Sequence, residues 1–417
     1  MKQLFLLLVG ALVFWSCETS TPEPPPPPPP PPPTDPTFEV SPEAQVAVSK
    51  TEETKVLVYY HSWYQSKEVD SYWGIRWRMN TKDPETILSD GRREIASHYY
   101  PVIGPYSSRD TLVLQLQSLW MKYSGIDGVS FDWYGTSGAN DFDFINGATE
   151  TAMTQFANAG LSSHVVLQDN AIYHAMDITQ STDTIAKLTA DFNYLKQLSS
   201  EPYWTKHNNS PVFMIKRPDF VRSNQTWDSA FALTSWSPEV FVIQSYSSRI
   251  SGAGEYGWPW GGGGDHRTNL EDFYKTRPNV EKIAAVYPGF RDFYAQGGWG
   301  GGVSWTIGIQ SGGTLANLFS LAKDYSFPFV QIATWNNYNE GTMIEPTLEE
   351  GIVLLEKVID YTGAPYDSTD LNRCLEWYEA TLAAEDEVDQ KICRQIYYEL
   401  ISLDTQRADE LFDLLEE

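Results

Sequence analysis

Short apolar segments alternate with longer mixed segments between residues 51 and 361 of this 417-residue chain. The apolar segments are rich in β-branched and aromatic residues, as expected for parallel strands that are covered on both faces. They span residues 56–61, 128–133, 164–169, 211–216, 240–246, 282–287 and 327–335, with a weaker candidate at 256–260. Segments 112–123 and 315–323 have the clearest helical periodicity. Seven or eight strands alternating with helices predict an α/β fold, a (β/α)8 barrel of the TIM type.

A doubly wound open sheet is the alternative to the barrel. Such sheets often bind dinucleotides or nucleotides through a glycine-rich turn after a strand. No G-x-G-x-x-G sequence follows the first predicted strand, and no G-x-x-x-x-G-K-[ST] sequence occurs in the chain. The sequence therefore favours the barrel.

Polar and aromatic residues directly follow several predicted strands, at 61–64, 132–135, 168–170 and 335–340. In a (β/α)8 barrel the C-terminal ends of the strands converge on the face that carries the active site. Glycine-rich segments 261–264 and 297–302 adjoin Trp258, Trp260 and Trp299, so they are candidates for an aromatic-lined rim, although they could be simple flexible connections.

The composition favours a neutral or basic polymer over an acidic one as the partner, and a glycan fits this. The chain carries 29 Lys and Arg against 55 Asp and Glu, a formal net charge of −26, which disfavours nucleic acid. Its 15 Trp and 24 Tyr suit stacking against sugar rings. No G-x-S-x-G or H-E-x-x-H sequence is present, so we expect neither a serine nucleophile nor zinc, and no cofactor. Candidate rim residues are the rings of Trp63, Tyr64, Trp133, Tyr134, Trp335 and Tyr338 and the carboxylates of Asp132, Asp169, Asp292, Glu340 and Glu345.

Five ordered motifs, at 58–64, 99–108, 127–135, 287–292 and 335–346, resemble the glycoside hydrolase family 71/99-like group. That group contains endo-α-mannosidases and endomannanases (family 99) and α-1,3-glucanases (family 71). The resemblance covers about residues 55–361. It implies a (β/α)8 barrel and a retaining attack on an α-linked mannan- or glucan-type glycan, often within the chain.

The last motif is similar to the group's W-N-[DE]-x-x-E pattern, whose second carboxylate is the general acid/base. That position is Glu340 here. The first carboxylate, which in the mannosidases takes a proton from a neighbouring sugar hydroxyl, is replaced by Asn337, and an amide cannot take up a proton near neutral pH. The resemblance also implies that His61 and Tyr64 contact substrate, a core position being the alternative for His61. Asn336 and the remaining rim residues named above complete the predicted substrate-binding set.

Three explanations for Asn337 stay open. Another rim carboxylate could supply the base, with Asp132 best placed and Asp169 or Asp292 next; a structural carboxylate bound to loop amides is the alternative for Asp132. The protein could instead be a non-catalytic glycan-binding lipoprotein. Hydrolysis could also be assisted by the substrate or use water directly, with Glu340 as the only protein acid.

The N-terminal segment predicts export and lipid anchoring. Lys2 precedes an apolar stretch that is too short to span a bilayer, and residues 1–16 end before Cys17 as a lipoprotein signal does. Plain secretion and a buried helix are the alternatives. Residues 17–50 contain an unbroken proline run at 24–33, a stiff spacer. We expect a protein lipid-anchored to the bacterial cell envelope, most simply at the outer membrane.

Residues 362–417 form the predicted C-terminal helical extension. Apolar residues recur there at three- and four-residue steps, which indicates two or three amphipathic helices. Cys374 and Cys393 lie in this region, and either a disulfide or two free buried thiols would fit.

Overall fold

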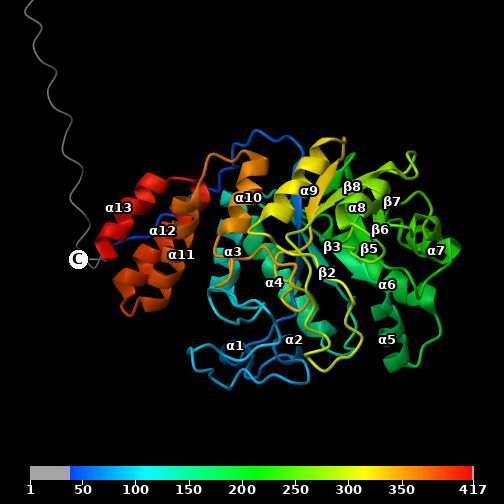
Figure 1. Ribbon diagram of the computed structural model, residues 1–417, viewed down its shortest axis with the longest axis horizontal. Coiled ribbons are helices and arrows are strands. Elements are labelled where there is room, and N and C mark those ends of the chain that lie inside the picture. The colour runs from blue at the N-terminus through cyan, green and yellow to red at the C-terminus, as the bar shows by residue number, and fades with distance from the viewer. Residues whose placement is uncertain (1–37, 416–417) are drawn as a thin grey trace, which may run out of the picture.

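The computed structural model describes residues 38–415 (Figure 1). Eight parallel strands each pair with the next along the chain, and the first pairs with the last, so the sheet closes into a barrel. The strands are β1 (Lys55–His61), β2 (Gly128–Trp133), β3 (Ser162–Gln168), β5 (Ser210–Lys216), β6 (Glu239–Ile243), β7 (Gly254–Tyr256), β8 (Lys282–Val286) and β9 (Phe329–Ile332). A short β4 (Lys206–His207) pairs antiparallel with β5. The predicted (β/α)8 barrel is confirmed.

The weakest predicted strand is the one whose limits differ most from the structure. Residues 256–260 were expected to be extended, but β7 ends at Tyr256. Pro259 follows three residues later, and proline removes a backbone donor that a central strand needs. Gly254 allows the strand to start earlier, since a Cβ there would lie 2.6 Å from the Phe241 ring.

Helices surround the barrel, and other helices lie among the loops at one of its ends (Figure 1). The helices that follow the strands include α3 (Thr111–Tyr123), α4 (Phe142–Asn158), α6 (Thr184–Leu198), α7 (Asn224–Thr234), α8 (His266–Lys275), α9 (Gly313–Lys323) and α10 (Val353–Thr362). Four further helical segments lie in loops after the strands: α1 (Lys67–Asp70), α2 (Ile75–Arg78), α5 (Asn170–Thr179) and the 3-10 helix Ser247–Arg249. The Asp110 side chain caps α3 by accepting from the backbone N–H groups of Leu112 and Val113.

Side chains fill the barrel interior in layers, as its alternating strand geometry requires. In the middle layer, His164 Nε2 lies 3.0 Å from Ser130 Oγ and 3.1 Å from Met214 Sδ. Two residues further along these strands, Asp132, Lys216 and their neighbours form a polar layer beneath the C-terminal mouth. The barrel therefore presents charged groups, not only packing residues, to the mouth.

Three helices follow the barrel: α11 (Ser368–Ala383), α12 (Glu387–Ser402) and α13 (Thr405–Leu415). They lie to one side of the barrel, next to α3 (Figure 1). Trp120 of α3 donates through Nε1 to the Leu371 carbonyl oxygen at 3.0 Å. Cys374 and Cys393 are free thiols, both buried, which decides between the two expectations for this pair.

The described chain begins beside the C-terminal helices. The Val46 N–H donates to the Ile401 carbonyl oxygen at 3.1 Å. The predicted signal segment, Cys17 and the proline run lie outside the described residues. Within residues 38–415, none of the helices combines the length and the apolar character that a membrane crossing would require.

Candidate active site

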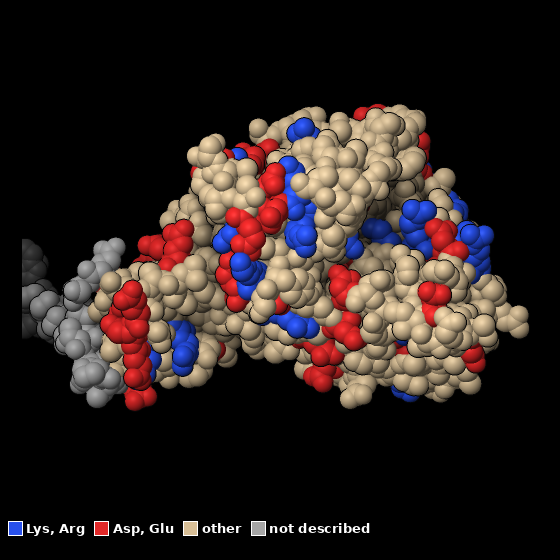
Figure 2. Space-filling model, turned by 90° about the horizontal axis from the view of Figure 1, so that it is seen from below, with Lys and Arg blue, Asp and Glu red and all other residues tan. Residues whose placement is uncertain are grey.

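The C-terminal face of the barrel is hollowed and lined by aromatic side chains. Figure 2 looks onto this face and shows Lys and Arg side chains around the hollow. Among the described residues, five aromatic side chains are exposed, and each follows the C-terminal end of a different barrel strand: Tyr72, Tyr173, Phe220, Trp260 and Trp299. Exposed rings on a single face are what a surface that binds sugar rings requires.

Glu340 lies at this face on a segment that is fixed to β1. The Trp335 N–H donates to the Tyr59 carbonyl oxygen at 2.7 Å. The Asn336 side chain pairs with both backbone groups of His61: Oδ1 accepts from the His61 N–H at 2.9 Å, and Nδ2 donates to the His61 carbonyl oxygen at 3.1 Å. The segment that carries Glu340 is therefore positioned by the end of the first strand.

The Glu340 carboxylate is half-buried and accepts one hydrogen bond on each oxygen. Tyr294 Oη donates to Oε1 at 2.8 Å, and Asn337 Nδ2 donates to Oε2 at 3.0 Å. Burial raises the pKa of Tyr294, so its hydroxyl stays protonated and donates. Asn337 thus contacts the carboxylate of Glu340 directly.

Asp132 lies beneath the mouth, at 1% exposure, with both oxygens fully used. Oδ1 accepts from Tyr59 Oη at 2.5 Å and from Gln168 Nε2, and Oδ2 accepts from His61 Nδ1 at 3.1 Å and from Tyr134 Oη at 2.9 Å. Burial alone would raise the pKa of Asp132, but His61, Lys216 and Tyr59 outweigh it and lower the pKa to about 2. The arrangement is that of an ionised carboxylate that orients its neighbours; a catalytic role for Asp132 itself stays a prediction.

A column of stacked groups runs from His61 towards Glu340. The His61 and Trp63 rings stack with their centroids 3.9 Å apart. The Arg76 guanidinium carbon lies 3.9 Å from the centre of the Trp63 ring and 5.2 Å from that of Trp299. Trp299 in turn stacks on Tyr294, with ring centroids 6.0 Å apart. The column ends at the hydroxyl that binds Glu340.

A second cation, Lys216, lies at the mouth at the end of β5. Its Nζ is 2.9 Å from the centre of the Trp258 ring and 5.0 Å from that of Tyr59. Burial lowers the pKa of Lys216 to about 8, although Glu340 and Asp132 both act to raise it. Within residues 38–415 it makes no ion pair closer than 4.0 Å.

Two hollows are lined in part by the exposed aromatic rings. A cleft of about 520 Å³ is lined by Tyr134, Arg76 and Trp299, together with Asn170 and His174. A pocket of about 260 Å³ is lined by Trp258 and Trp260 at one end and extends along α8 to Thr276 and Arg277 at the other. The cleft is the hollow that adjoins the polar layer of the mouth, because Tyr134, which lines it, donates to Asp132 at 2.9 Å.

Several predicted substrate-binding residues are buried and support the site from within. Tyr64 Oη donates to the Asn336 carbonyl oxygen at 2.7 Å. Glu345 accepts hydrogen bonds from Tyr106, Gln117 and Tyr338, and burial raises the pKa of Glu345 to about 7. Trp335 is fully buried.

Three further predicted residues bind protein groups. Trp133 donates through Nε1 to Asn146 Oδ1 at 2.7 Å. Asp169 accepts from the N–H groups of Phe220 and Val221, and burial raises its pKa to about 6. Asp292 accepts from the N–H groups of Tyr294 at 3.1 Å and Val303 at 3.0 Å. Both carboxylates bind loop amides, so a direct contact between any of these three residues and substrate stays a prediction.

Two central residues, Arg76 and Tyr294, were not among the predicted site residues. Tyr294 lies two residues beyond the 287–292 motif, and Arg76 lies in α2, far from any strand end. The sequence signal that could have identified Arg76 is the interleaving of aromatic and basic residues at 73–78, since guanidinium groups stack on indole rings.

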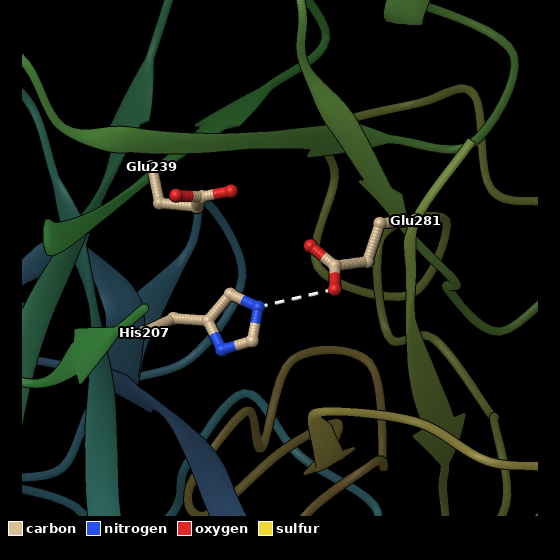
Figure 3. Close-up of side chains that lie close together, drawn as sticks. All are labelled: His207, Glu239 and Glu281. Carbon is tan, nitrogen blue, oxygen red and sulfur yellow. Dashed lines mark hydrogen bonds and ion pairs between the residues drawn. The ribbon is translucent and has the colours of Figure 1, made fainter. Parts of the chain in front are cut away.

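A separate group of potential metal ligands lies at the opposite end of the barrel (Figure 3). It consists of His207 of β4, Glu239 at the start of β6 and Glu281 just before β8, and one ligand atom from each lies within 4.8 Å of the others. His207 Nε2 is 3.1 Å from Glu281 Oε1. The group is at the N-terminal ends of the strands, so it is not part of the candidate active site.

A closed (β/α)8 barrel with a partly exposed carboxylate and aromatic rings at its C-terminal face has the architecture of a barrel-type glycoside hydrolase. No family model matches the sequence. The chain is 24% identical over 330 residues to the glycoprotein endo-alpha-1,2-mannosidase-like protein of Mus musculus, covering 69% of this chain and 68% of that protein. A protein of the same name from Danio rerio is 35% identical over 86 residues, 18% of this chain, and only 19% of that relative's length is matched.

Solved structures share the fold. Two structures of the GH99 endo-alpha-mannosidase from Bacteroides thetaiotaomicron, one in complex with bis-tris-propane, match with TM-scores of 0.58 and 0.54. Each is 16% identical to this chain and is covered completely, while 76% and 78% of this chain are covered. The resemblance to the glycoside hydrolase family 71/99-like group is therefore confirmed, and the relatives of this chain are glycoside hydrolases.

Proposed function

We propose that the protein is a glycoside hydrolase that cleaves an α-mannosyl glycan, with Glu340 as general acid/base. The observation that carries the proposal is the half-buried Glu340 carboxylate at the C-terminal face of the barrel, with one hydrogen-bond donor on each oxygen. The mannosidase names of the relatives support the choice of substrate class.

Glu340 in its protonated form would donate its proton to the departing glycosidic oxygen, and as a carboxylate it would then accept a proton from the incoming water. The donors on its two oxygens fix the direction of the carboxyl group before substrate binds. Such preorganisation is how a site stabilises charge that develops in the transition state.

Endo-action, which is cleavage within a glycan chain, is part of the proposal. The names of the relatives, which include endo-alpha-mannosidases, support it. The aromatic face supports it as well, because exposed rings on five separate loops, among them Trp260 and Trp299, could contact several sugar units of one chain.

A non-catalytic glycan-binding protein is the second candidate, and Asn337 is the observation that favours it. Its amide donates to Glu340 at the position where the related pattern has a carboxylate. A protein that had lost its base would keep the aromatic face and still bind sugars.

The test replaces Glu340 by Gln and measures the release of reducing ends from α-mannans and α-glucans. We expect the wild type to release reducing ends and the variant to lose activity at least 100-fold, since one general acid contributes about 10²–10⁴-fold, with unchanged unfolding and glycan binding. Glu356→Gln, on α10, is the matched control. Full activity in E340Q would refute the assignment of Glu340, and binding without hydrolysis by the wild type would favour the glycan-binding alternative.

We also propose that the protein is exported and lipid-anchored through Cys17. The apolar segment before Cys17 and the following proline run support this location. The test is incorporation of a labelled fatty acid by cells that express the chain. Labelling that persists in Cys17→Ser would contradict the proposal.

A further inference from the structure

We propose that His61 is the general base of this site and takes the role that Asn337 cannot fill. The inference rests on the proposed hydrolase function. It concerns a basic nitrogen at the mouth that is buried, has no hydrogen-bond partner among residues 38–415, and belongs to a ring oriented by a carboxylate.

The geometry around His61 is that of an oriented neutral imidazole. His61 is the last residue of β1 and is paired with Asp132 across the β1–β2 register. Its Nδ1 lies 3.1 Å from Asp132 Oδ2. The hydroxyls of Tyr59 and Tyr134 also donate to this carboxylate and hold it in position. A carboxylate in this position selects the tautomer with hydrogen on Nδ1 and so leaves the lone pair on Nε2.

Nε2 is buried and has no hydrogen-bond partner among the described residues. A buried polar atom without a partner calls for an explanation, and a substrate hydroxyl that completes the bonding of Nε2 would supply one. Burial lowers the pKa of His61 from its ordinary value of 6.5, although Asp132 opposes that shift, so the imidazole is neutral and can accept a proton near pH 7.

Asn336 couples this base to the proposed acid. Its amide holds both backbone groups of His61, and Glu340 lies four residues further along the same segment. The stacked column of Trp63, Arg76 and Trp299 joins the two groups on a second path through Tyr294. Base and acid are thus held by one short segment and one set of contacts.

The proposed step conserves atoms and charge. The attacking hydroxyl, that of the sugar carbon next to the anomeric carbon, loses its proton to His61 Nε2 as its oxygen forms a bond with the anomeric carbon. The bond from the anomeric carbon to the glycosidic oxygen breaks, and that oxygen takes the proton of Glu340. Water then opens the strained ring: its oxygen forms a bond with the anomeric carbon while Glu340 accepts its proton. The bond from the anomeric carbon to the attacking sugar oxygen breaks, and that oxygen takes back the proton of the imidazolium.

The charged groups around His61 come from two barrel strands, β2 and β5, and from the loops after β1 and β9. Asp132 and Glu340 act to raise the pKa of His61, and Lys216 acts to lower it. Arg76 lies on the far side of the Trp63 ring. A histidine base predicts that activity falls on the acidic side as this imidazole is protonated, whereas a carboxylate base would retain activity to lower pH.

The experiment compares wild type, His61→Asn, Asn337→Asp and the double variant on an α-mannan oligosaccharide panel. Asn at position 61 can still donate to Asp132 but lacks Nε2. His61→Gln serves as a second variant if H61N unfolds early, and His207→Asn, at the opposite end of the barrel, is the matched histidine control.

We expect H61N to lose at least 100-fold in kcat while glycan binding is kept, and H61N/N337D to regain activity with its acidic limb moved to lower pH. H61N within fivefold of wild type overturns the role of His61 and leaves Glu340 untouched. An inactive wild type with an active N337D also overturns it, because the native chain would then lack a working base. If no variant cleaves or binds any glycan, the proposed function fails as well.

Discussion

Replacing Asp132 by Asn tests whether one buried carboxylate organises the mouth of the barrel. Each of its oxygens accepts two hydrogen bonds, from Tyr59 and Gln168 on one side and from His61 and Tyr134 on the other. The amide of Asn has one acceptor oxygen and an NH2 group that points its own hydrogens at two of these donors. Breaking a buried charged network in this way costs about 3–5 kcal/mol of unfolding free energy.

The pH dependence of the unfolding free energy separates the contribution of the Asp132 charge from that of the packing around it. The pKa of Asp132 falls from 3.8 to about 2 on folding, which corresponds to about 2 kcal/mol of stabilisation. Because the folded-state pKa is the lower one, this stabilisation is complete above pH 3.8 and is lost as the pH falls towards 2. The D132N variant should lack this part of the pH dependence.

The assay is urea unfolding followed by tryptophan fluorescence at pH 7 and at several values between pH 5 and pH 2. We expect D132N to be less stable at pH 7 and to approach the wild type at the acidic end. Asp191→Asn is not a suitable control, since Asp191 is also buried and paired; Asp360→Asn on the surface of α10 is suitable. Equal stability of D132N and wild type at pH 7, within about 0.5 kcal/mol, would refute the network as described.

Two further predictions concern Glu340 and the aromatic face. Tyr294→Phe removes one hydrogen-bond donor from Glu340 but keeps the ring that stacks on Trp299. We therefore expect kcat to fall about tenfold, with glycan binding and unfolding unchanged. Steady-state kinetics and calorimetry measure these quantities, and an unaltered kcat would exclude Tyr294 from the chemistry. Trp260→Ala and Trp299→Ala each remove an exposed ring. Each should weaken α-mannan binding about 3–10-fold, which is equivalent to about 1 kcal/mol per stacked ring. The control is Leu382→Ala, an exposed position on α11 where the affinity should not change; equal effects of all three substitutions would rule out a specific role for the rings.

The barrel could be predicted from the sequence because strands covered on both faces leave nearly continuous apolar segments, and six of the eight strands lie within or next to the predicted limits by this pattern alone. The face was predictable too, since polar residues after parallel strands must meet at one end. The roles of single side chains were less accessible. Asp169 and Asp292 follow strands as a catalytic acid would, but each binds loop amides. Arg76 reaches the mouth from a loop helix, a position that only tertiary packing determines.

The exposed rings stand on five separate loops, after β1, β3, β5, β7 and β8. None of these rings takes part in the pairing of the barrel strands. One loop could therefore change its length or lose its ring while the rings on the other four loops continue to contact the glycan. The preference for a particular branch or linkage could thus change at one sugar-binding position at a time, while the barrel and Glu340 stay the same.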